Sequence, residues 1–177
     1  MAELAFRLMD QEDAAEVSTL VLSGFDTYIG SEYAPPGIAE FRKYAEAAAL
    51  ADRARHDHFV VIVRSEGVLA GMIEMRQNNH VSLLFVAEAF QRQGLSRMLL
   101  DRAIAEARDR SGELERMTVN SSRYGVPAYK ALGFRQTGPE RSVDGMLFTP
   151  MAMRLDAEPG SGSQRSGISG VEPRKLP

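Results

Sequence analysis

The residues best suited to chemistry lie between Val86 and Arg97, where an apolar stretch ends and an amphipathic one begins. Successive backbone N–H groups at the start of a helix form an anion site at the positive end of the helix dipole. Gly94 allows an anion to approach closely, and Arg92 and Arg97 add positive charge for a diphosphate. The spacing matches neither the glycine pattern of dinucleotide folds nor a P-loop. The segment therefore indicates an anion site, with a glycine that serves only the turn as the alternative.

The stretch LLFVAEAFQRQGLSRMLLDRAIAEA resembles the acyl-CoA pyrophosphate motif of the GNAT superfamily of N-acyltransferases. The family signature is Arg/Gln-x-x-Gly-x-Gly/Ala, and Gln91, Gly94 and Ser96 occupy its three marked positions. Ser96 departs from the usual Gly or Ala, but its small hydroxyl leaves room for a phosphate and can donate to it. A second stretch, VNSSRYGVPAYKALGF, is similar to the family's strand and helix that end in Tyr-x-x-x-Gly-Phe.

The resemblance implies where the cofactor, acetyl-CoA, lies. In the family fold the strands ending at Val86 and Asn120 splay apart, and the acyl-pantetheine arm lies in the gap. Main-chain groups near Val86 would pair with the arm as an added strand does. Asn120 would hydrogen-bond the arm or the thioester, or else pair only with local backbone. The cofactor-binding residues predicted in this way are Phe85, Val86, Gln91, Arg92, Gln93, Gly94, Leu95, Ser96, Arg97 and Asn120.

The same resemblance implies that Tyr129 is catalytic. Attack of an amine on a thioester ends in expulsion of the CoA thiolate, and a phenol with a pKa of about 10 can protonate that sulfur while staying neutral. The alternative is a ring that only packs on the sheet, and Tyr124, in the preceding loop, is the weaker candidate. A base must take the proton of the amine. Glu74 and His80 are the two candidates, with a solvent-facing Glu74 and a turn-capping His80 as alternatives.

A mixed sheet is needed to position these residues, and the hydrophobic pattern predicts one. Strands are expected at 4–8, 59–63, 68–75, 80–86, 117–120 and 147–155. A turn at Glu66-Gly67 is expected before the strand 68–75, and another at 77–79 before the strand 80–86. Helices are expected from Gln11, along 38–48, over 95–109 and over 126–132, with a loop at 30–37. Pro150 predicts an edge strand or a bulge. The expected class is α/β, with the GNAT-type acyl-CoA N-acyltransferase fold: a mixed, mostly antiparallel sheet flanked by helices, with splayed central strands.

The composition is that of a soluble globular protein, with 177 residues of which 44% are hydrophobic and 25% charged. A formal net charge of −3 gives no global attraction to nucleic acid or to an anionic membrane. Cysteine is absent, which excludes disulfides and fits a reducing compartment. Neither a signal peptide nor a run of membrane-spanning length is visible. We therefore expect a cytoplasmic protein with no nucleic-acid or membrane partner.

The composition changes near Asp156, so residues 1–155 are expected to form the acetyltransferase domain and residues 156–177 a tail. The tail is rich in Gly, Ser and Pro, which predicts disorder, with a partner-binding peptide as the alternative. His56-Asp57-His58 could suggest a metal pair. No third ligand is in view, so a solvated turn is predicted there, and no metal is expected.

The predicted function is transfer of an acetyl group from acetyl-CoA to a primary amine of a small molecule or peptide. Because the chain has no cysteine, no acyl-cysteine can form, and the amine must attack the thioester directly. The alternatives are a non-catalytic acyl-CoA-binding or regulatory domain and transfer of a longer acyl group. The acceptor is expected beside the first two helices, where Phe25, Tyr28, Tyr33 and Phe41 offer aromatic walls. The identity of the acceptor and the existence of a homodimer stay open.

Overall fold

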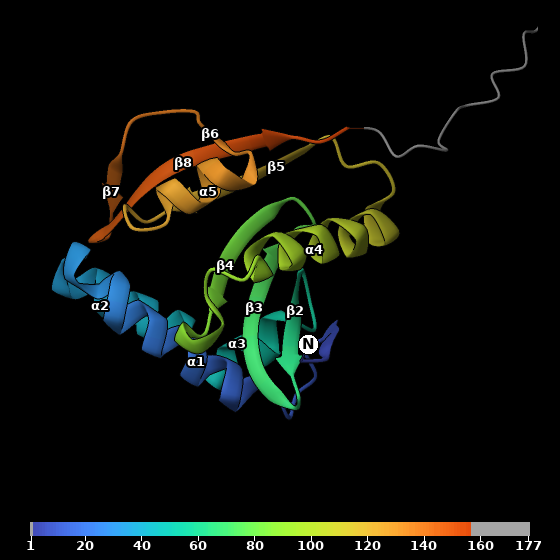
Figure 1. The fold of residues 1–177 in the computed structure, drawn as a ribbon. Coiled ribbons are helices and arrows are strands. Elements are labelled where there is room, and N and C mark those ends of the chain that lie inside the picture. Colours follow the sequence, from blue (N-terminus) through green and yellow to red (C-terminus); the bar gives the residue numbers. More distant parts are fainter. Residues whose placement is uncertain (1, 157–177) are drawn as a thin grey trace, which may run out of the picture.

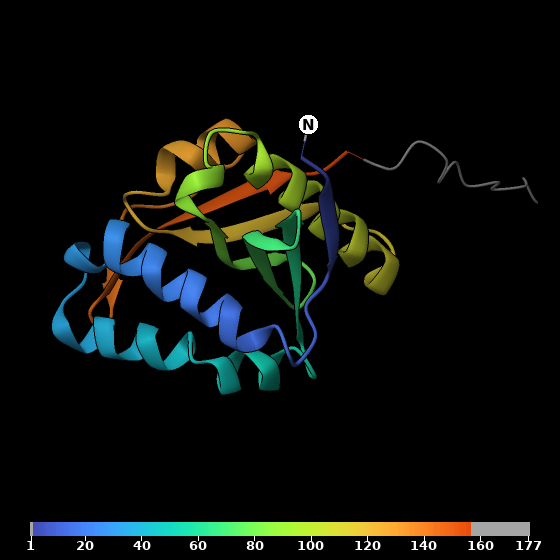
Figure 2. The ribbon, with the colours of Figure 1, turned by 60° about the horizontal axis from the view of Figure 1, so that its bottom comes forward.

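In the computed structural model, residues 2–156 are described, and they form one eight-stranded sheet with helices on both faces (Figures 1 and 2). The strand order is β1-β2-β3-β4-β5-β8-β6, and β7 pairs with β8. The strands are β1 (Leu4–Leu8), β2 (His58–Ser65), β3 (Val68–Arg76), β4 (His80–Val86), β5 (Arg116–Ser121), β6 (Arg135–Gln136), β7 (Arg141–Val143) and β8 (Met146–Arg154). The pairs are antiparallel except for β4 and β5, which are parallel, so the expected α/β class with a mixed, mostly antiparallel sheet is confirmed.

Two turns in the left-handed region shape the central hairpins. Glu66 and Gly67 have φ values of 49° and 83°, which suit the two-residue turn between β2 and β3. Gln77 and Asn78, at 50° and 60°, make the turn between β3 and β4. β2 is rich in β-branched residues and is buried along almost its whole length, as expected of a strand covered on both faces.

The splay between β4 and β5 is the feature that positions the site. The two strands pair at His80–Thr118 and Val81–Val119. Beyond these positions β4 continues to Val86 and β5 turns away toward β8, as Figure 1 shows. The predicted splay of the central strands is therefore confirmed.

The helices cover both faces of the sheet. They are α1 (Ala14–Tyr28), α2 (Pro35–Tyr44), α3 (Ala47–Arg53), α4 (Leu95–Ser111) and α5 (Val126–Leu132), with short 3₁₀ helices η1 (Gly30–Glu32) and η2 (Glu88–Phe90). One core cluster joins α4 and α5 to the sheet, and the other lies under α1 and α3. No helix among residues 2–156 is both long enough and apolar enough to cross a membrane. The tail predicted for 156–177 lies, except for Asp156, outside the described residues.

The N-terminal helices differ from the predicted ones. α1 begins at Ala14 and not near Gln11. The Asp10 carboxylate accepts the N–H groups of Glu12 and Asp13, but the backbone there makes i→i−3 bonds, from Asp13 N to Asp10 O and from Ala14 N to Gln11 O, so a tight turn precedes the α-helix. The loop predicted for 30–37 was wrong in its second half: Pro35 starts α2, where a proline without an N–H is tolerated.

The single helix predicted for 38–48 is two helices. The chain breaks between α2 and α3 near Ala45, whose carbonyl accepts the Ser18 hydroxyl at 2.6 Å. The break turns α3 along α1 and leaves α2 to reach across to β8.

Pro150 does not place β8 at an edge, because β5 and β6 lie on its two sides. The Pro150 carbonyl accepts the Thr137 N–H at 2.9 Å, next to the two-residue β6. The N–H and C=O of one strand residue point to the same side, so the missing N–H also falls there and leaves the ladder with β5 intact.

Candidate active site

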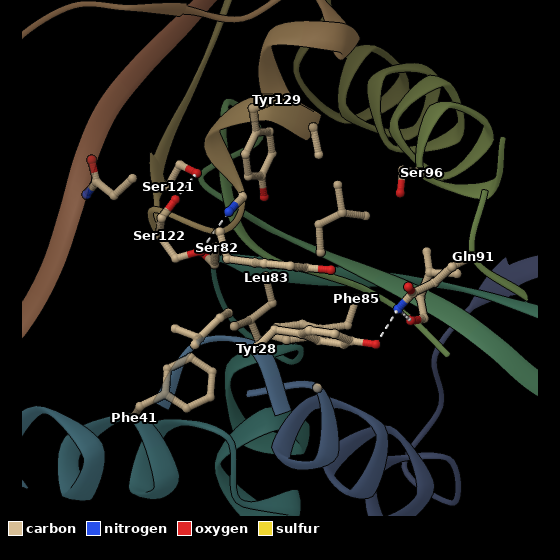
Figure 3. A pocket seen from close by; sticks show the side chains of 18 of the residues that line it. Tyr28, Phe41, Ser82, Leu83, Phe85, Gln91, Ser96, Ser121, Ser122 and Tyr129 are labelled. Atoms are coloured by element: carbon tan, nitrogen blue, oxygen red, sulfur yellow. Dashed lines mark hydrogen bonds between the residues drawn. The ribbon is translucent and has the colours of Figure 1, made fainter. Parts of the chain in front are cut away.

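The splayed strands open into a cavity of about 350 Å³, which we call the gap cavity (Figure 3). Its walls come from α1, from β4, from the loop before α4, and from the segment joining β5 to α5. The lining residues used below are Tyr28, Ser82, Phe85, Val86, Gln91, Arg92, Ser96, Asn120, Tyr124 and Tyr129. The gap between the strands is therefore a real pocket that reaches the start of α4.

The start of α4 presents a row of unpaired amides. Arg92 and Gly94 have φ values of 59° and 81°, which curve the chain just before the helix. A Cβ on Gly94 would meet nothing within 4 Å, so the backbone conformation and not crowding calls for glycine there. From Arg92 to Arg97 the backbone N–H groups donate to no acceptor among residues 2–156. Six amides in this curve make a nest for a diphosphate-sized anion at the helix dipole.

The side chains of this segment are used differently from one another. Gln91 Nε2 donates to the Val86 carbonyl at 3.1 Å and to the Tyr28 hydroxyl at 3.4 Å, so it fixes the end of β4 (Figure 3). Gln93 Nε2 turns back to Ala89 O at 3.2 Å. Ser96 lines the cavity, and the side chain of Leu95 is buried in the core. Gln93 and Leu95 therefore offer an anion only their backbone N–H groups, because their side chains are turned away from it.

Arg97 is placed differently from the expectation. Its guanidinium donates to the carbonyls of Leu132 and Ala131 at 3.0 Å each, at the C-terminal end of α5. A cation there satisfies carbonyls that the helix leaves unpaired and interacts favourably with its dipole. The charge predicted for a diphosphate thus ties α4 to α5. Arg92 remains at the nest, and its side chain makes no hydrogen bond or ion pair among residues 2–156.

Tyr129 points into the gap cavity from α5 (Figure 3). Its ring packs edge-on against Phe134, with ring centroids 5.4 Å apart. Burial raises the pKa of the Tyr129 phenol well above its usual range. The hydroxyl has no hydrogen-bond partner among residues 2–156, so a protonated phenol is presented to the cavity with its donor free.

A β-bulge opens the middle of β4. Glu74 pairs with Leu83 and Met75 with Val81, which leaves Ser82 as the extra residue on β4. Ser82 and Asn120 both line the gap cavity, from the two splayed strands. Ser82 is not among the site residues predicted from the sequence, although a polar residue within the apolar run HVSLLFV was a visible signal.

The main chain near the end of β4 also faces the gap. Val86 pairs with Gly71, and Ala87 N donates to Ala70 O at 2.8 Å. In an antiparallel ladder this makes Val86–Gly71 a pair without mutual hydrogen bonds, so the Val86 amide and carbonyl point away from β3. Phe85 lines the gap cavity beside it. The Val86 carbonyl already accepts Gln91 Nε2, so its amide is the group left for an extended chain lying in the gap.

A second cavity, of about 510 Å³, lies between α2 and the other side of the splay, and we call it the α2 cavity. It shares Tyr33, Phe41, Ser82, Leu83 and Asn120 with the gap cavity, so the two open onto the same point of β4. Phe25, expected among the aromatic walls, is instead fully buried and stacks on Phe41 at 4.0 Å.

His80 lines the α2 cavity, and its Nδ1 lies 2.7 Å from Thr118 Oγ1. Burial, with smaller contributions from Arg76 and His58, lowers the pKa of His80 to about 4. The imidazole is therefore neutral at pH 7. Its Nε2 has no hydrogen-bond partner among residues 2–156 and is the nitrogen left for a ligand.

Glu74, the other base candidate, lines neither cavity. Its side chain is fully buried, and Arg53 Nη2 and Nε donate to its Oε1 at 2.9 and 3.1 Å. The Tyr44 hydroxyl donates to Oε2 at 2.9 Å. Burial and the Glu74 charge raise the pKa of Tyr44 to about 12. Glu74 is thus enclosed by donors, in an ion pair that anchors α3 and the end of α2 to β3.

The segment His56-Asp57-His58 is only partly a solvated turn. His56 is exposed, but His58 begins β2, is buried, and lies 2.7 Å from Asp57 Oδ1. Among residues 2–156 no three His, Cys, Asp or Glu side chains are grouped as metal ligands.

Contacts between the N-terminal helices and the loop before α5, beside the gap cavity, were not expected from the sequence. Tyr28 of α1 stacks on Tyr124, with ring centroids 4.6 Å apart. Glu32 of η1 accepts the N–H groups of Arg123 and Tyr124 at 3.0 and 2.9 Å. The N-terminal helices therefore hold the loop before α5 directly.

Solved structures with the same architecture are acetyltransferases. A GCN5-related N-acetyltransferase from Rhodopseudomonas palustris has a TM-score of 0.73 at 19% identity, over 88% of this chain and 98% of its own. PaiA N-acetyltransferase from Thermoplasma acidophilum, in complex with coenzyme A, has a TM-score of 0.72 at 14% identity, over 86% and 99%. YncA from Salmonella typhimurium, a putative acetyltransferase with acetyl-CoA, has a TM-score of 0.64 at 22% identity, over 86% and 94%. At these identities the likeness shows the fold.

No curated protein matches the chain. A family model described as an acetyltransferase (GNAT) domain matches residues 29–155, which includes the nest, both splayed strands and Tyr129. With the fold and this match in agreement, the chain belongs to the GNAT acetyltransferase family.

Proposed function

We propose that this protein transfers an acetyl group from acetyl-CoA directly to a primary amine. The observation that carries the proposal is the gap cavity: it places the free hydroxyl of Tyr129 between the unpaired amides that begin at Arg92 and the α2 cavity. The coenzyme A of the Thermoplasma relative and the acetyl-CoA of the Salmonella relative support acetyl-CoA as the co-substrate.

The chemistry of the gap cavity suits the parts of this co-substrate. The nest from Arg92 to Arg97 would hold the diphosphate, and the outward-facing main chain of Val86 would pair with the amides of the pantetheine arm. Asn120 and Ser82 would then flank the thioester, where both cavities meet. The chain has no cysteine, so the acyl group passes directly to the amine.

Tyr129 would complete the reaction. When the amine has added to the thioester carbonyl, the C–S bond breaks and its electron pair leaves with the sulfur, as a thiolate that accepts a proton. A neutral phenol beside it donates its proton and regains one from water. Because burial raises its pKa, the Tyr129 phenol is protonated at neutral pH and has a proton to donate.

His80 is the base candidate that the geometry favours over Glu74. His80 lines the α2 cavity with Nε2 free, whereas both carboxylate oxygens of Glu74 are bonded to Arg53 and Tyr44. With a pKa of about 4, His80 would accept a hydrogen bond from the incoming amine. The proton of the amine would then pass to water, and His80 would not stay protonated.

Thiol release from acetyl-CoA over a panel of small amines and peptides tests the function, together with calorimetric binding of acetyl-CoA. We expect binding and amine-dependent release. Binding without release on any amine would favour a non-catalytic acyl-CoA-binding domain. Faster release from a longer acyl-CoA would change the donor, and absence of binding would contradict every form of the proposal.

Tyr129→Phe should lower kcat by about 10²-fold and leave the Kd of acetyl-CoA nearly unchanged, because the ring and its packing remain while the donor is lost. Tyr124→Phe is the matched comparison, since it keeps the ring stacked on Tyr28 and removes a hydroxyl from the loop. Steady-state kinetics on one amine measures both. A larger loss at Tyr124→Phe would reverse the assignment.

A further inference from the structure

The α2 cavity carries information about the acceptor that the sequence does not. Its apolar wall is formed by Val81 and Leu83 of β4 and by Met146 and Phe148 of β8. A volume of about 510 Å³ is that of a small-molecule site. Because the cavity opens beside Ser82 and Asn120, a molecule bound in it reaches the place assigned to the thioester.

Positive charge dominates the polar part of this cavity. Lys43, Arg53 and Arg76 line it, with Glu40 as the one carboxylate among its lining residues. Arg53 is bound to Glu74 and to the Tyr44 carbonyl. The lining thus carries two further cations, Lys43 and Arg76, against one carboxylate.

Lys43 and Arg76 are not used by the fold. Neither side chain makes a hydrogen bond or an ion pair among residues 2–156, and both residues are exposed. Asp57 lies near enough to Arg76 to feel its charge, but its Oδ1 is bonded to His58. The charge of Arg76 also reaches into the cavity, where it contributes after burial to the lowered pKa of His80.

We infer that the acceptor is a small amine that also carries a carboxylate, such as an amino acid with an apolar side chain. Its amine would lie at Ser82 and Asn120, its apolar part against Leu83 and Phe148, and its carboxylate would bind Arg76 and Lys43. Charge-assisted hydrogen bonds from an arginine and a lysine are the usual way to hold a carboxylate. This inference rests on the proposed amine acetylation and narrows its substrate.

Matched acceptors test the inference. Each amino carboxylate is compared with its amide and with the amine that lacks the group altogether, over both apolar α-amino acids and ω-amino acids of increasing length. We expect kcat/KM to be at least about tenfold higher for the carboxylate at the preferred length. An equal or higher kcat/KM for the amides would overturn the inference.

Variants locate the contact. Arg76→Gln and Lys43→Gln should each reduce the preference for the carboxylate over its amide about tenfold. Arg42→Gln is the matched control, because Arg42 is the neighbour of Lys43 on α2 but pairs with Asp26 and does not line the cavity. A preference that survives both cavity substitutions would place the carboxylate elsewhere and contradict the inference.

Direct binding separates this inference from the proposed function. Calorimetric titration of the amino acid and its amide into the protein saturated with CoA needs no turnover. Tighter binding of the carboxylate, lost in Arg76→Gln, would support the anion site even if no amine released thiol. Turnover of amines with no carboxylate preference in either assay would leave the function standing and remove the inference.

Discussion

At the scale of single residues, ionisable side chains for which the sequence predicts the same role have different partners in the fold. Arg92 and Arg97 flank the same motif, yet Arg97 holds the C-terminal carbonyls of α5 while Arg92 stays exposed beside the nest. Glu74 and His80 lie on neighbouring strands, but Glu74 is enclosed by Arg53 and Tyr44. Residue type and spacing predict which groups are available, whereas partners distant in sequence decide what each group does.

The burial of His80 should make the stability of the protein depend on pH. Its pKa is lowered from 6.5 to about 4 in the folded chain, so the unfolded chain binds a proton more readily between these values. The contribution of His80 to stability is therefore complete above pH 6.5 and is lost as the pH falls toward 4. In His80→Asn the melting temperature should decline less steeply over this window than in the wild type.

Calorimetric scans from pH 7 to pH 4 measure this difference. His56→Asn is the matched control, since it removes an exposed histidine by the same exchange. Parallel pH profiles for the wild type and His80→Asn would show that His80 keeps an ordinary pKa in the fold, against the expectation.

At the scale of elements, the α2 cavity depends on how α2 docks on the turn between β7 and β8. Gly37 is buried, and a Cβ there would collide with the backbone of Gly145, which itself has a φ of 80°. The Gly145 carbonyl also accepts the Ala34 N–H at 3.0 Å, just before α2. Two glycines thus allow a helix and a hairpin turn to meet backbone to backbone.

Gly37→Ala should push α2 off this turn. The strain of an extra methyl in a close contact is about 1–3 kcal/mol of unfolding free energy. Because α2 carries Phe41 and Lys43 of the α2 cavity, the KM of the acceptor should rise about tenfold or more while the Kd of acetyl-CoA stays within about twofold. Denaturant unfolding and steady-state kinetics measure the two effects.

Gly30→Ala is the control, since its Cβ would meet Phe25 at an ordinary 3.5 Å. If Gly37→Ala weakened acetyl-CoA binding and left the acceptor KM unchanged, the two cavities would have been assigned the wrong way round.

The elements that sequence predicted well are those whose cause is local. The strand at Leu4–Leu8 and the helix at Val126–Leu132 agree residue for residue, because alternation and the left-handed Gly133 act within a few residues. The break between α2 and α3 could not be predicted, since it depends on the Ser18 hydroxyl from another helix. The nest could be predicted from its motif. The α2 cavity depends on the contact between Gly37 and Gly145, which are distant in sequence, so no local pattern predicts it.

At the scale of the whole molecule, the sheet is two half-sheets whose strands pair over only a short stretch, beside the site. β1 to β4 form one half and β5 to β8 the other, and the parallel pairing between them covers His80–Thr118 and Val81–Val119. Further links lie outside the sheet: Arg97 on α5, the Tyr28–Tyr124 stack, and Glu32 on the amides before α5. The Ala34 N–H also donates to the Gly145 carbonyl, and the core cluster under α4 contains residues of both halves. A ligand in the gap cavity touches both halves and should therefore stabilise the molecule as a unit.

Saturating acetyl-CoA should thus raise the melting temperature by several degrees, since binding at about 100 times Kd adds about 2.7 kcal/mol. Hydrogen exchange should locate the effect: acetyl-CoA should protect Val86 on one half and the 120–122 segment on the other, in addition to the amides from Arg92 to Arg97. ADP, which has the diphosphate but no pantetheine arm, should protect the nest alone. If ADP protected both strands as much as acetyl-CoA does, the pantetheine arm would not lie in the gap. The arm is the part of acetyl-CoA expected to contact both half-sheets, so the difference in protection between the two ligands tests whether it does.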